Sequence, residues 1–457
     1  MTELDLRGKK ELLLAYVAAH ETGGAPQLEM HESDVAEVLL SLRDEDGDEN
    51  YRRILRALPP ELLGTTVLEL PEKVQDELVK SMDAQEWAAV VNELDTDDAT
   101  DIVQKIEEVD EEKAYEIMRQ VDAEHKEDIE NLKRFDEDSA GAIMQTELFS
   151  ARLDERIADS IKRLKKLIKD EEVSNIHYVF VVDEQNRLKA MLSLEELIML
   201  DFGKTYGESL EEFDEPISVY GDDTLETVTQ TVERYDLAVI PVVDNFGHLM
   251  GRITSDDIYD MIEEAATEQI YSLGQVDSNE EWQDDVIKTG RTRAKWLAIN
   301  LITATLGALV VSLFAESIEQ IVALAILMPI VASMGGVAGT QALTVTVRQM
   351  ALGEVKLENA RPVVMREMGI ALLNGLVFAL LASLLAWAWF KMPMLGVVIA
   401  LAMFANMMYA GFFGAGIPLV LKKFGIDPAV ASAVLLITVT DVAGFFTFLG
   451  LATLILL

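Results

Sequence analysis

Cysteine is absent from this 457-residue chain, and histidine occurs only five times. The lack of thiols excludes disulfides and thiolate metal sites, and the scarcity of histidine argues against a zinc site. Positive charge is also scarce, because 38 Lys and Arg face 80 Asp and Glu, giving a formal net charge of −42. A chain with this charge repels a polyanion, so we expect no nucleic acid among its partners.

Acidic residues are nearly missing from the C-terminal part, and this divides the chain in two. Only seven of the 80 Asp and Glu follow residue 290, whereas ten of the 38 Lys and Arg do. The first part is therefore strongly acidic, and the second is nearly neutral and apolar. The N-terminal stretch lacks a signal-peptide pattern, since its apolar run is short and flanked by acids. We therefore expect the acidic part to stay in the cytoplasm.

Several apolar stretches in the second part are long enough to cross a lipid bilayer as helices, which takes about 20 residues each. They cover about 296–315, 321–347, 368–390, 394–420 and 429–457. Basic residues gather before the first stretch, between the second and third, and between the fourth and fifth. By the positive-inside rule, the N-terminus is cytoplasmic and the C-terminus extracytoplasmic. We expect a multi-pass protein of the cell (inner or plasma) membrane.

Asp441 lies inside the fifth stretch, where no Lys or Arg neutralises it. A charge at the centre of a membrane helix costs about 2.5–3.5 kcal/mol or more, so such an acid is a candidate functional residue. We predict a pore ion site at Asp441, with Thr438 one turn earlier and Gln341 from the second stretch. One carboxylate is a poor cage for a divalent ion, so we expect two copies to meet on the axis of a homodimer. The alternative is a structural, protonated or helix-capping aspartate.

The second stretch contains residues that weaken a helix in mid-membrane, namely Pro329, Gly335, Gly336 and Gly339. Irregular backbone at that depth persists only where it is buried in protein or lines an aqueous cavity. The sequence therefore predicts backbone carbonyls that are free to face an ion. Close helix packing through small residues is the alternative, and both remain open.

A repeat with a period of 61 residues occurs in the acidic part. HYVFVVDEQNRLKAMLSLEEL begins at His177, and AVIPVVDNFGHLMGRITSDDI begins at Ala238. Each copy predicts a β-hairpin followed by a capped helix. Such tandem copies resemble a pair of CBS domains, a module that often binds adenine nucleotides. Residues 1–138 instead contain short amphipathic segments, which predict a superhelix of stacked helical hairpins, with an unrelated helical bundle as the alternative.

Acidic residues recur at helical spacing after the second copy of the repeat. Asp257, Asp260, Glu264 and Glu268 share one helix face. Like charges at this spacing destabilise a helix unless something neutralises them. We predict that a divalent cation does so and that these residues form a metal sensor, together with Asp427 at the cytoplasmic end of the fifth stretch. A solvated acidic face is the alternative.

The order of these parts resembles that of the MgtE family of magnesium channels. The most specific stretches are MPIVASMGG, GTQAL, GIDPAVAS and TDVAGFF. The resemblance implies a homodimer with its pore between protomers, an ion site at Asp441, and a plug helix over about 256–274. It also implies that Mg²⁺ between the acidic domains favours closure of the pore.

Three features depart from the family pattern. The segment 433–438 before Asp441 reads AVLLIT, where members often have Gly-Pro-x-x-Thr-Thr. Val337 follows the paired glycines, where members usually have asparagine. Glu195 and Glu196 replace the Arg-Asp pair of members that bind ATP, and an acid at residue 195 would repel phosphates. An adenine nucleotide therefore stays a possible partner with unknown binding residues.

We expect a multidomain membrane protein whose parts follow one another along the chain. They are an all-α N-terminal superhelical domain (1–138), tandem α+β CBS domains (139–200 and 201–255), a connecting plug helix with linker (256–290), and a transmembrane domain of five helices (291–457).

Three functions are compatible with this organisation. The first is a Mg²⁺-selective, Mg²⁺-gated channel or transporter for magnesium uptake and homeostasis, with Mg²⁺ as its ion. The second is a transporter of Mn²⁺, Co²⁺ or Ni²⁺, which the lack of cysteine and the scarcity of histidine disfavour. The third is a CBS-based nucleotide-sensing receptor that transports nothing. The sequence has no P-loop, nucleophile elbow or HExxH motif, so we do not expect an enzyme.

Overall fold

The computed structural model describes residues 5–24, 28, 30–45, 48–169, 176–277, 280, 286–355, 357, 360–426 and 428–457. The chain forms two compact units, Met1–Ile262 and Glu263–Leu457. The second unit therefore begins before the change in composition near residue 290. It includes the C-terminal half of the connecting helix, in which Gln269 accepts a hydrogen bond from the Arg348 guanidinium at 3.3 Å.

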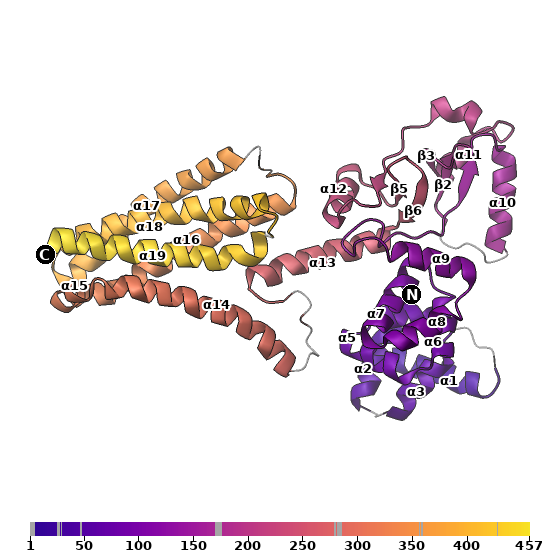
Figure 1. The fold of residues 1–457 in the computed structure, drawn as a ribbon, viewed down its shortest axis with the longest axis horizontal. Coiled ribbons are helices and arrows are strands. Elements are labelled where there is room, and N and C mark those ends of the chain that lie inside the picture. Colours follow the sequence, from indigo (N-terminus) through magenta and orange to yellow (C-terminus); the bar gives the residue numbers. More distant parts are fainter. Residues whose placement is uncertain are drawn as a thin grey trace. The chain divides into compact units, whose positions relative to one another are not determined.

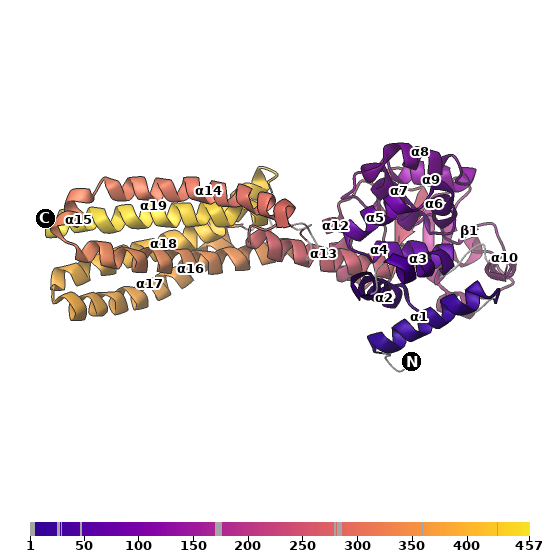
Figure 2. The same ribbon diagram turned by 90° about the horizontal axis from the view of Figure 1, so that it is seen from below.

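The N-terminal part of the first unit is all-α, as predicted. Its described helices are α1 (Leu6–Glu21), α2 (Glu32–Glu45), α3 (Asp48–Ala57), α4 (Pro60–Leu68), α5 (Glu72–Ser81), α6 (Ala84–Val91), α7 (Thr96–Val109), α8 (Glu111–Met118) and α9 (Ala123–Leu132). Local capping sets where they begin: Asp83 and Glu86 form a capping box at α6. Alternate helices pack on one another, α4 on α6 and α6 on α8, as well as α5 on α7 and α7 on α9. This pattern is that of stacked helical hairpins (Figure 2).

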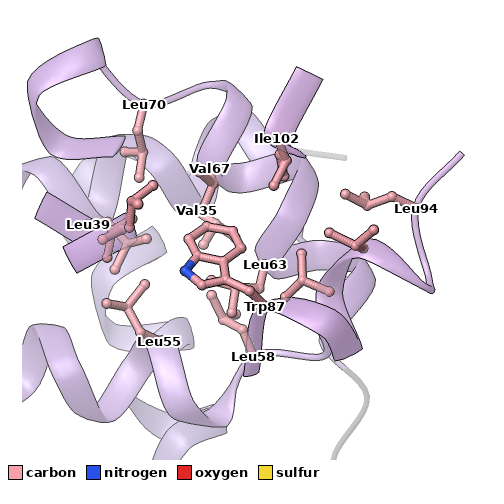
Figure 3. Packing of buried hydrophobic residues seen from close by; sticks show 14 of the residues in the cluster. Val35, Leu39, Leu55, Leu58, Leu63, Val67, Leu70, Trp87, Leu94 and Ile102 are labelled. Atoms are coloured by element: carbon pink, nitrogen blue, oxygen red, sulfur yellow. The ribbon is translucent and has the colours of Figure 1, made fainter. Parts of the chain in front are cut away.

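Trp87 is the largest fully buried side chain of this helical stack and has no exposed surface. Figure 3 shows its indole ring enclosed by aliphatic side chains from several helices. The labelled neighbours are Val35, Leu39, Leu55, Leu58, Leu63, Val67, Leu70, Leu94 and Ile102. The core therefore joins α2, α3, α4, α6 and α7 around one aromatic residue.

The 61-residue repeat forms two small sheets, each with one parallel and one antiparallel strand pair. The first contains β1 (Ser150–Arg152), β2 (Tyr178–Val182) and β3 (Leu188–Ser193), with α10 (Ile157–Lys169) and α11 (Leu194–Met199). The second contains β4 (Val219–Tyr220), β5 (Ile240–Val243) and β6 (Leu249–Ile253), with α12 (Leu225–Tyr235), and the 3₁₀ helix η1 (Gly207–Glu212) precedes it. In each copy a hairpin is followed by a helix, as the sequence predicts: α11 follows β3, and the helix Ser255–Leu273 follows β6.

The two copies are joined through their hairpin turns. The Leu188 amide donates to the Gly247 carbonyl at 3.0 Å, and the Leu249 amide donates to the Asn186 carbonyl at 2.9 Å. Asn186 and Gly247 both have positive φ, at 60° and 84°, which asparagine and glycine tolerate best. The paired turns make the two CBS copies one structural body.

The connecting helix α13 (Ser255–Leu273) begins within the second CBS core. Ile258 and Met261 are buried there beside Ile240 and Val228. These apolar contacts fix the first turns of α13, including Asp257, against the sheet.

The second unit contains helices long and apolar enough to cross a membrane (Figure 1). They are α14 (Val286–Ser312), α16 (Ala323–Ala351), α17 (Ala360–Phe390), α18 (Pro393–Lys423) and α19 (Pro428–Leu456), and the short α15 (Ala315–Gln320) links the first two. These five match the predicted spans, and the first four extend beyond them at the ends that carry basic residues. Helix α18 is central and packs on α16, α17 and α19.

The prediction of irregular backbone in the second span is wrong. Helix α16 is continuous from Ala323 to Ala351, with Pro329 inside it. The glycines allow close helix packing instead: a Cβ at Gly339 would lie 2.9 Å from the Leu436 side chain of α19. The small residues therefore permit close approach between helices, the alternative that the sequence left open.

Replacing Trp87 with alanine should destabilise the N-terminal helices by about 3–5 kcal/mol, because a large cavity forms in their core. Hydrogen exchange of the α6 and α7 amides in the full-length protein measures this loss. Tyr115→Ala is the control, since 69% of the Tyr115 surface is exposed. Equal protection in the two variants would contradict the role given to Trp87.

Candidate functional site

Asp441 lies near the middle of α19 and is half-buried. Its position excludes a helix-capping role, which requires a helix end. Within the described residues its carboxylate has no hydrogen-bond or ion-pair partner, and α19 contains no basic residue. An acid in this position is a candidate functional residue.

The other two predicted pore residues differ in their surroundings. Thr438 is half-buried, and its hydroxyl donates to the Val434 carbonyl at 2.7 Å, a local bond within α19. Its oxygen keeps acceptor capacity for another group. Gln341 is exposed on α16, whereas the close approach of α16 to α19 is made by Gly339 against Leu436.

A second group of acids meets in the first unit, where the first turn of α7 faces the start of α13. We call Asp95, Asp97, Asp98, Glu147, Asp256 and Asp257 the acidic cluster. Asp97 is buried, with 6% of its surface exposed, and burial together with the charges of Asp257 and Asp98 holds its pKa well above the usual value. Burial, followed by the charge of Asp257, raises the pKa of Asp98 to about 7. These carboxyls oppose one another's ionisation.

Asp257 is held in this cluster by Thr254, the residue before the first turn of α13. Its carboxylate accepts from the Thr254 hydroxyl at 2.9 Å and from the Thr254 amide at 3.2 Å, which caps α13. Burial nevertheless raises the pKa of Asp257 to about 6, and the neighbouring charges of Asp256 and Asp260 act in the same direction.

Hydrogen bonds join the helical stack to the CBS pair beside the cluster. The Thr96 hydroxyl donates to Glu147 Oε2 at 3.0 Å and accepts from the Thr146 amide at 2.9 Å. Arg252 of β6 is buried, and the charges of Asp95 and Glu147 act on it. Burial lowers the pKa of Arg252, and a single guanidinium leaves most of the cluster charge unbalanced.

The predicted sensor residues are only partly brought together. Asp257 enters the cluster and Asp260 lies one turn further along the first unit's part of α13, exposed to solvent. Glu264 and Glu268 are exposed and belong to the second unit, and Asp427 lies outside the described residues.

Sequence reasoning missed the acids that face Asp257. Asp95, Asp97, Asp98 and Glu147 come from a different domain, so helical spacing along one segment does not reveal them. The stretch ELDTDDATD held a signal, because it places several acids at the start of an amphipathic helix.

Within the described part of the chain, no three acidic or histidine side chains are arranged to hold a metal ion. The cluster supplies concentrated charge, which suits an ion that keeps its waters.

A cleft of about 620 Å³ lies between the two CBS copies. Its walls include Tyr178, His177 and Ala238, together with Arg252 and Thr254. Acids also line it, namely Glu195, Asp95 and Asp256. The size suits a nucleoside, whereas the acidic wall disfavours a string of phosphates.

The fold and these sites define a multi-pass membrane protein with an acidic helical domain and a CBS pair. Family profiles agree along most of the chain: an MgtE intracellular N domain at 30–138, CBS domains at 140–203 and 211–264, and the MgtE divalent cation transporter domain at 328–451. The magnesium transporter MgtE of Thermus thermophilus is 31% identical over 430 residues, which cover 94% of each chain. The chain belongs to the MgtE family.

Two further similarities concern the whole chain and its first unit. The magnesium transporter MgtE of Bacillus subtilis is 27% identical over 440 residues, covering 92% of this chain and 96% of that one. A crystal structure of the cytosolic domain of the Mg²⁺ channel MgtE in complex with ATP is 28% identical, with a TM-score of 0.46. It covers 56% of this chain and 94% of that one.

The contact between α7 and α13 should weaken as the pH rises in the absence of divalent ions. The pKa values of Asp98 and Asp257 are raised by folding to about 7 and 6, so the folded contact binds protons that the separated carboxyls release. Its stability is therefore fully present at low pH and is lost as the pH rises through about 6 to 7.

Hydrogen exchange of the α7 and α13 amides, measured in EDTA between about pH 5 and 8 and corrected for intrinsic exchange, tests this dependence. Asp98→Asn should flatten it, whereas Asp236→Asn, at an exposed left-handed position, should not. Protection that stays constant with pH in the unmodified chain would contradict the expectation.

Proposed function

We propose that this chain forms a homodimeric, Mg²⁺-selective channel that takes up magnesium, with Asp441 as the ion site of the pore. The observation that carries the proposal is an unpartnered carboxylate in mid-membrane on a helix without basic residues. The relatives from Thermus thermophilus and Bacillus subtilis are magnesium transporters, which supports the choice of ion. Mg²⁺ prefers oxygen ligands and usually retains several waters, which suits a sparse carboxylate site.

The face of α19 that carries Asp441 is incompletely covered by its own chain. Ile437 lies about 40° from Asp441 around the helix and is 40% exposed. Helix α14 is also poorly covered, since only 6% of its most apolar 18-residue stretch is buried. A second copy related by a two-fold axis would cover such surfaces and bring two Asp441 carboxylates to one aqueous path.

The acidic cluster supplies the sensor. Without a cation, the like charges of Asp97, Asp98 and Asp257 push α7 away from α13. Bound Mg²⁺ offsets this repulsion and favours the compact state, so its concentration sets the balance between the two states. Helix α13 is continuous from Asp257 to Gln269, which bonds Arg348 of the membrane unit. In this proposal, the compact state of the α7–α13 contact is transmitted along α13 and closes the pore.

Orientation and chemistry complete the proposal. The basic links between the spans support an N-terminus in the cytoplasm and a C-terminus outside the cell membrane. Carboxylate, hydroxyl and amide oxygens favour Mg²⁺ over softer ions such as Co²⁺ and Ni²⁺. The chain carries ions and catalyses no reaction.

The CBS cleft favours a secondary, regulatory role. Its volume of about 620 Å³ accommodates an adenine nucleotide, the kind of ligand named for the related cytosolic domain. Glu195 on its wall repels phosphates, so a ligand with few phosphates suits this cleft better than ATP.

Asp441→Asn should reduce Mg²⁺ flux into proteoliposomes to the background level, because the amide removes the charge that attracts the cation. Glu316→Gln is the matched control, an exposed acid of the short α15. Comparing Mg²⁺ with Mn²⁺ and Ni²⁺ in the same assay tests the choice of ion. Normal Mg²⁺ flux through Asp441→Asn would remove this residue from the pore.

The double variant Asp98→Asn/Asp257→Asn should respond less to Mg²⁺ on the cytoplasmic side, because its cluster neither repels nor binds cations as strongly. Channel activity in membrane patches, recorded over a series of Mg²⁺ concentrations, measures this response. The control is Glu112→Gln/Glu116→Gln, exposed acids of α8. An unchanged concentration dependence would exclude the cluster as the sensor.

A further inference from the structure

Asn406 is a fully buried amide at the centre of the membrane unit. It lies on α18 and has no exposed surface. Its amide nitrogen donates to the Val331 carbonyl of α16 at 2.8 Å. Its side-chain oxygen is buried and accepts no hydrogen bond from the described residues. A half-satisfied amide in such surroundings is less favourable than a well-packed apolar side chain, because one of its polar atoms is desolvated without a partner.

Two glycines from different helices enclose this amide. A Cβ at Gly444 of α19 would lie 2.8 Å from the Asn406 nitrogen and 3.0 Å from its oxygen. A Cβ at Gly335 of α16 would overlap the same nitrogen. Three helices therefore meet at one side chain, and neither glycine can gain a methyl group unless Asn406 moves.

The contact at Gly444 also bears on Asp441. The two residues are three positions apart, which corresponds to about 60° around the helix and about 4.5 Å along its axis. A rotation of α19 that moved Gly444 away from Asn406 would turn Asp441 by the same angle. The amide thus defines the direction in which the carboxylate points.

We propose that Asn406 is a positioning residue for ion passage, which holds α19 in the rotation that presents Asp441 to the pore. The inference rests on the proposed function, since it assumes that ions pass Asp441. A leucine would fill similar volume without an unsatisfied oxygen, so packing alone does not explain the asparagine. The amide supplies a directional bond to α16 that an aliphatic side chain cannot make.

A double-mutant cycle tests this role in purified protein reconstituted into liposomes. Gly444→Ala should lower maximal Mg²⁺ flux about tenfold, because its methyl group displaces the amide and turns α19. Adding Asn406→Ala makes room for that methyl group, so the double variant should conduct better than Gly444→Ala alone. Gly416→Ala on α18 is the control, since a Cβ there meets no atom within 4 Å.

Asn406→Leu keeps the assay informative if Gly444→Ala fails to fold. It should keep its thermal stability within a few degrees, lower maximal flux, and change the ratio of Mg²⁺ to Mn²⁺ flux. Unchanged flux and ion ratio in Asn406→Leu, or a double variant no better than Gly444→Ala, would overturn the positioning role. Normal flux through Asp441→Asn would instead overturn the proposed pore site itself, whatever the Asn406 variants do.

Discussion

Negative charge that the protein does not neutralise is the constraint on which both units of this molecule depend. In the membrane unit, one carboxylate sits in mid-helix without a basic residue on its helix. In the first unit, buried carboxyls from two domains face one another around a single guanidinium. Both arrangements cost free energy in an empty protein, because desolvation and repulsion penalise the ionised form. Under the proposed function, a small divalent cation offsets this cost at both sites.

The two sites use this constraint in different ways. At Asp441 the chain contributes one acid, so the proposed pore site combines two copies of the chain with an ion that keeps its water shell. At the acidic cluster, acids at the start of α7 face acids at the start of α13, with Glu147 beside them. Under the proposed function, a cation bound there favours the compact state, and the continuous helix α13 transmits this change. In this proposal the same ion is both the transported substrate and the regulatory ligand.

The sequence predicted features that depend on local periodicity. Apolar length identified the membrane helices, and the repeat of hairpin and helix identified the CBS pair. Asp441 stood out because a charge in an apolar stretch is visible without knowledge of the fold. Asp97 and Asp98 were missed because their significance arises from a contact with Asp257, far away in the sequence. The prediction of irregular backbone at the glycines of α16 was wrong for a related reason. These glycines make room for Asn406 and Leu436, which lie on other helices.

The shared turns of the CBS copies constrain how such a module can evolve. Asn186 and Gly247 offer their carbonyls to the opposite copy, so each hairpin completes the hydrogen bonding of the other. A single copy on its own would lose these bonds and expose the apolar strands behind them. Duplication, transfer between genes and loss should therefore act on the pair as one inherited block, and lengthening either turn should be selected against.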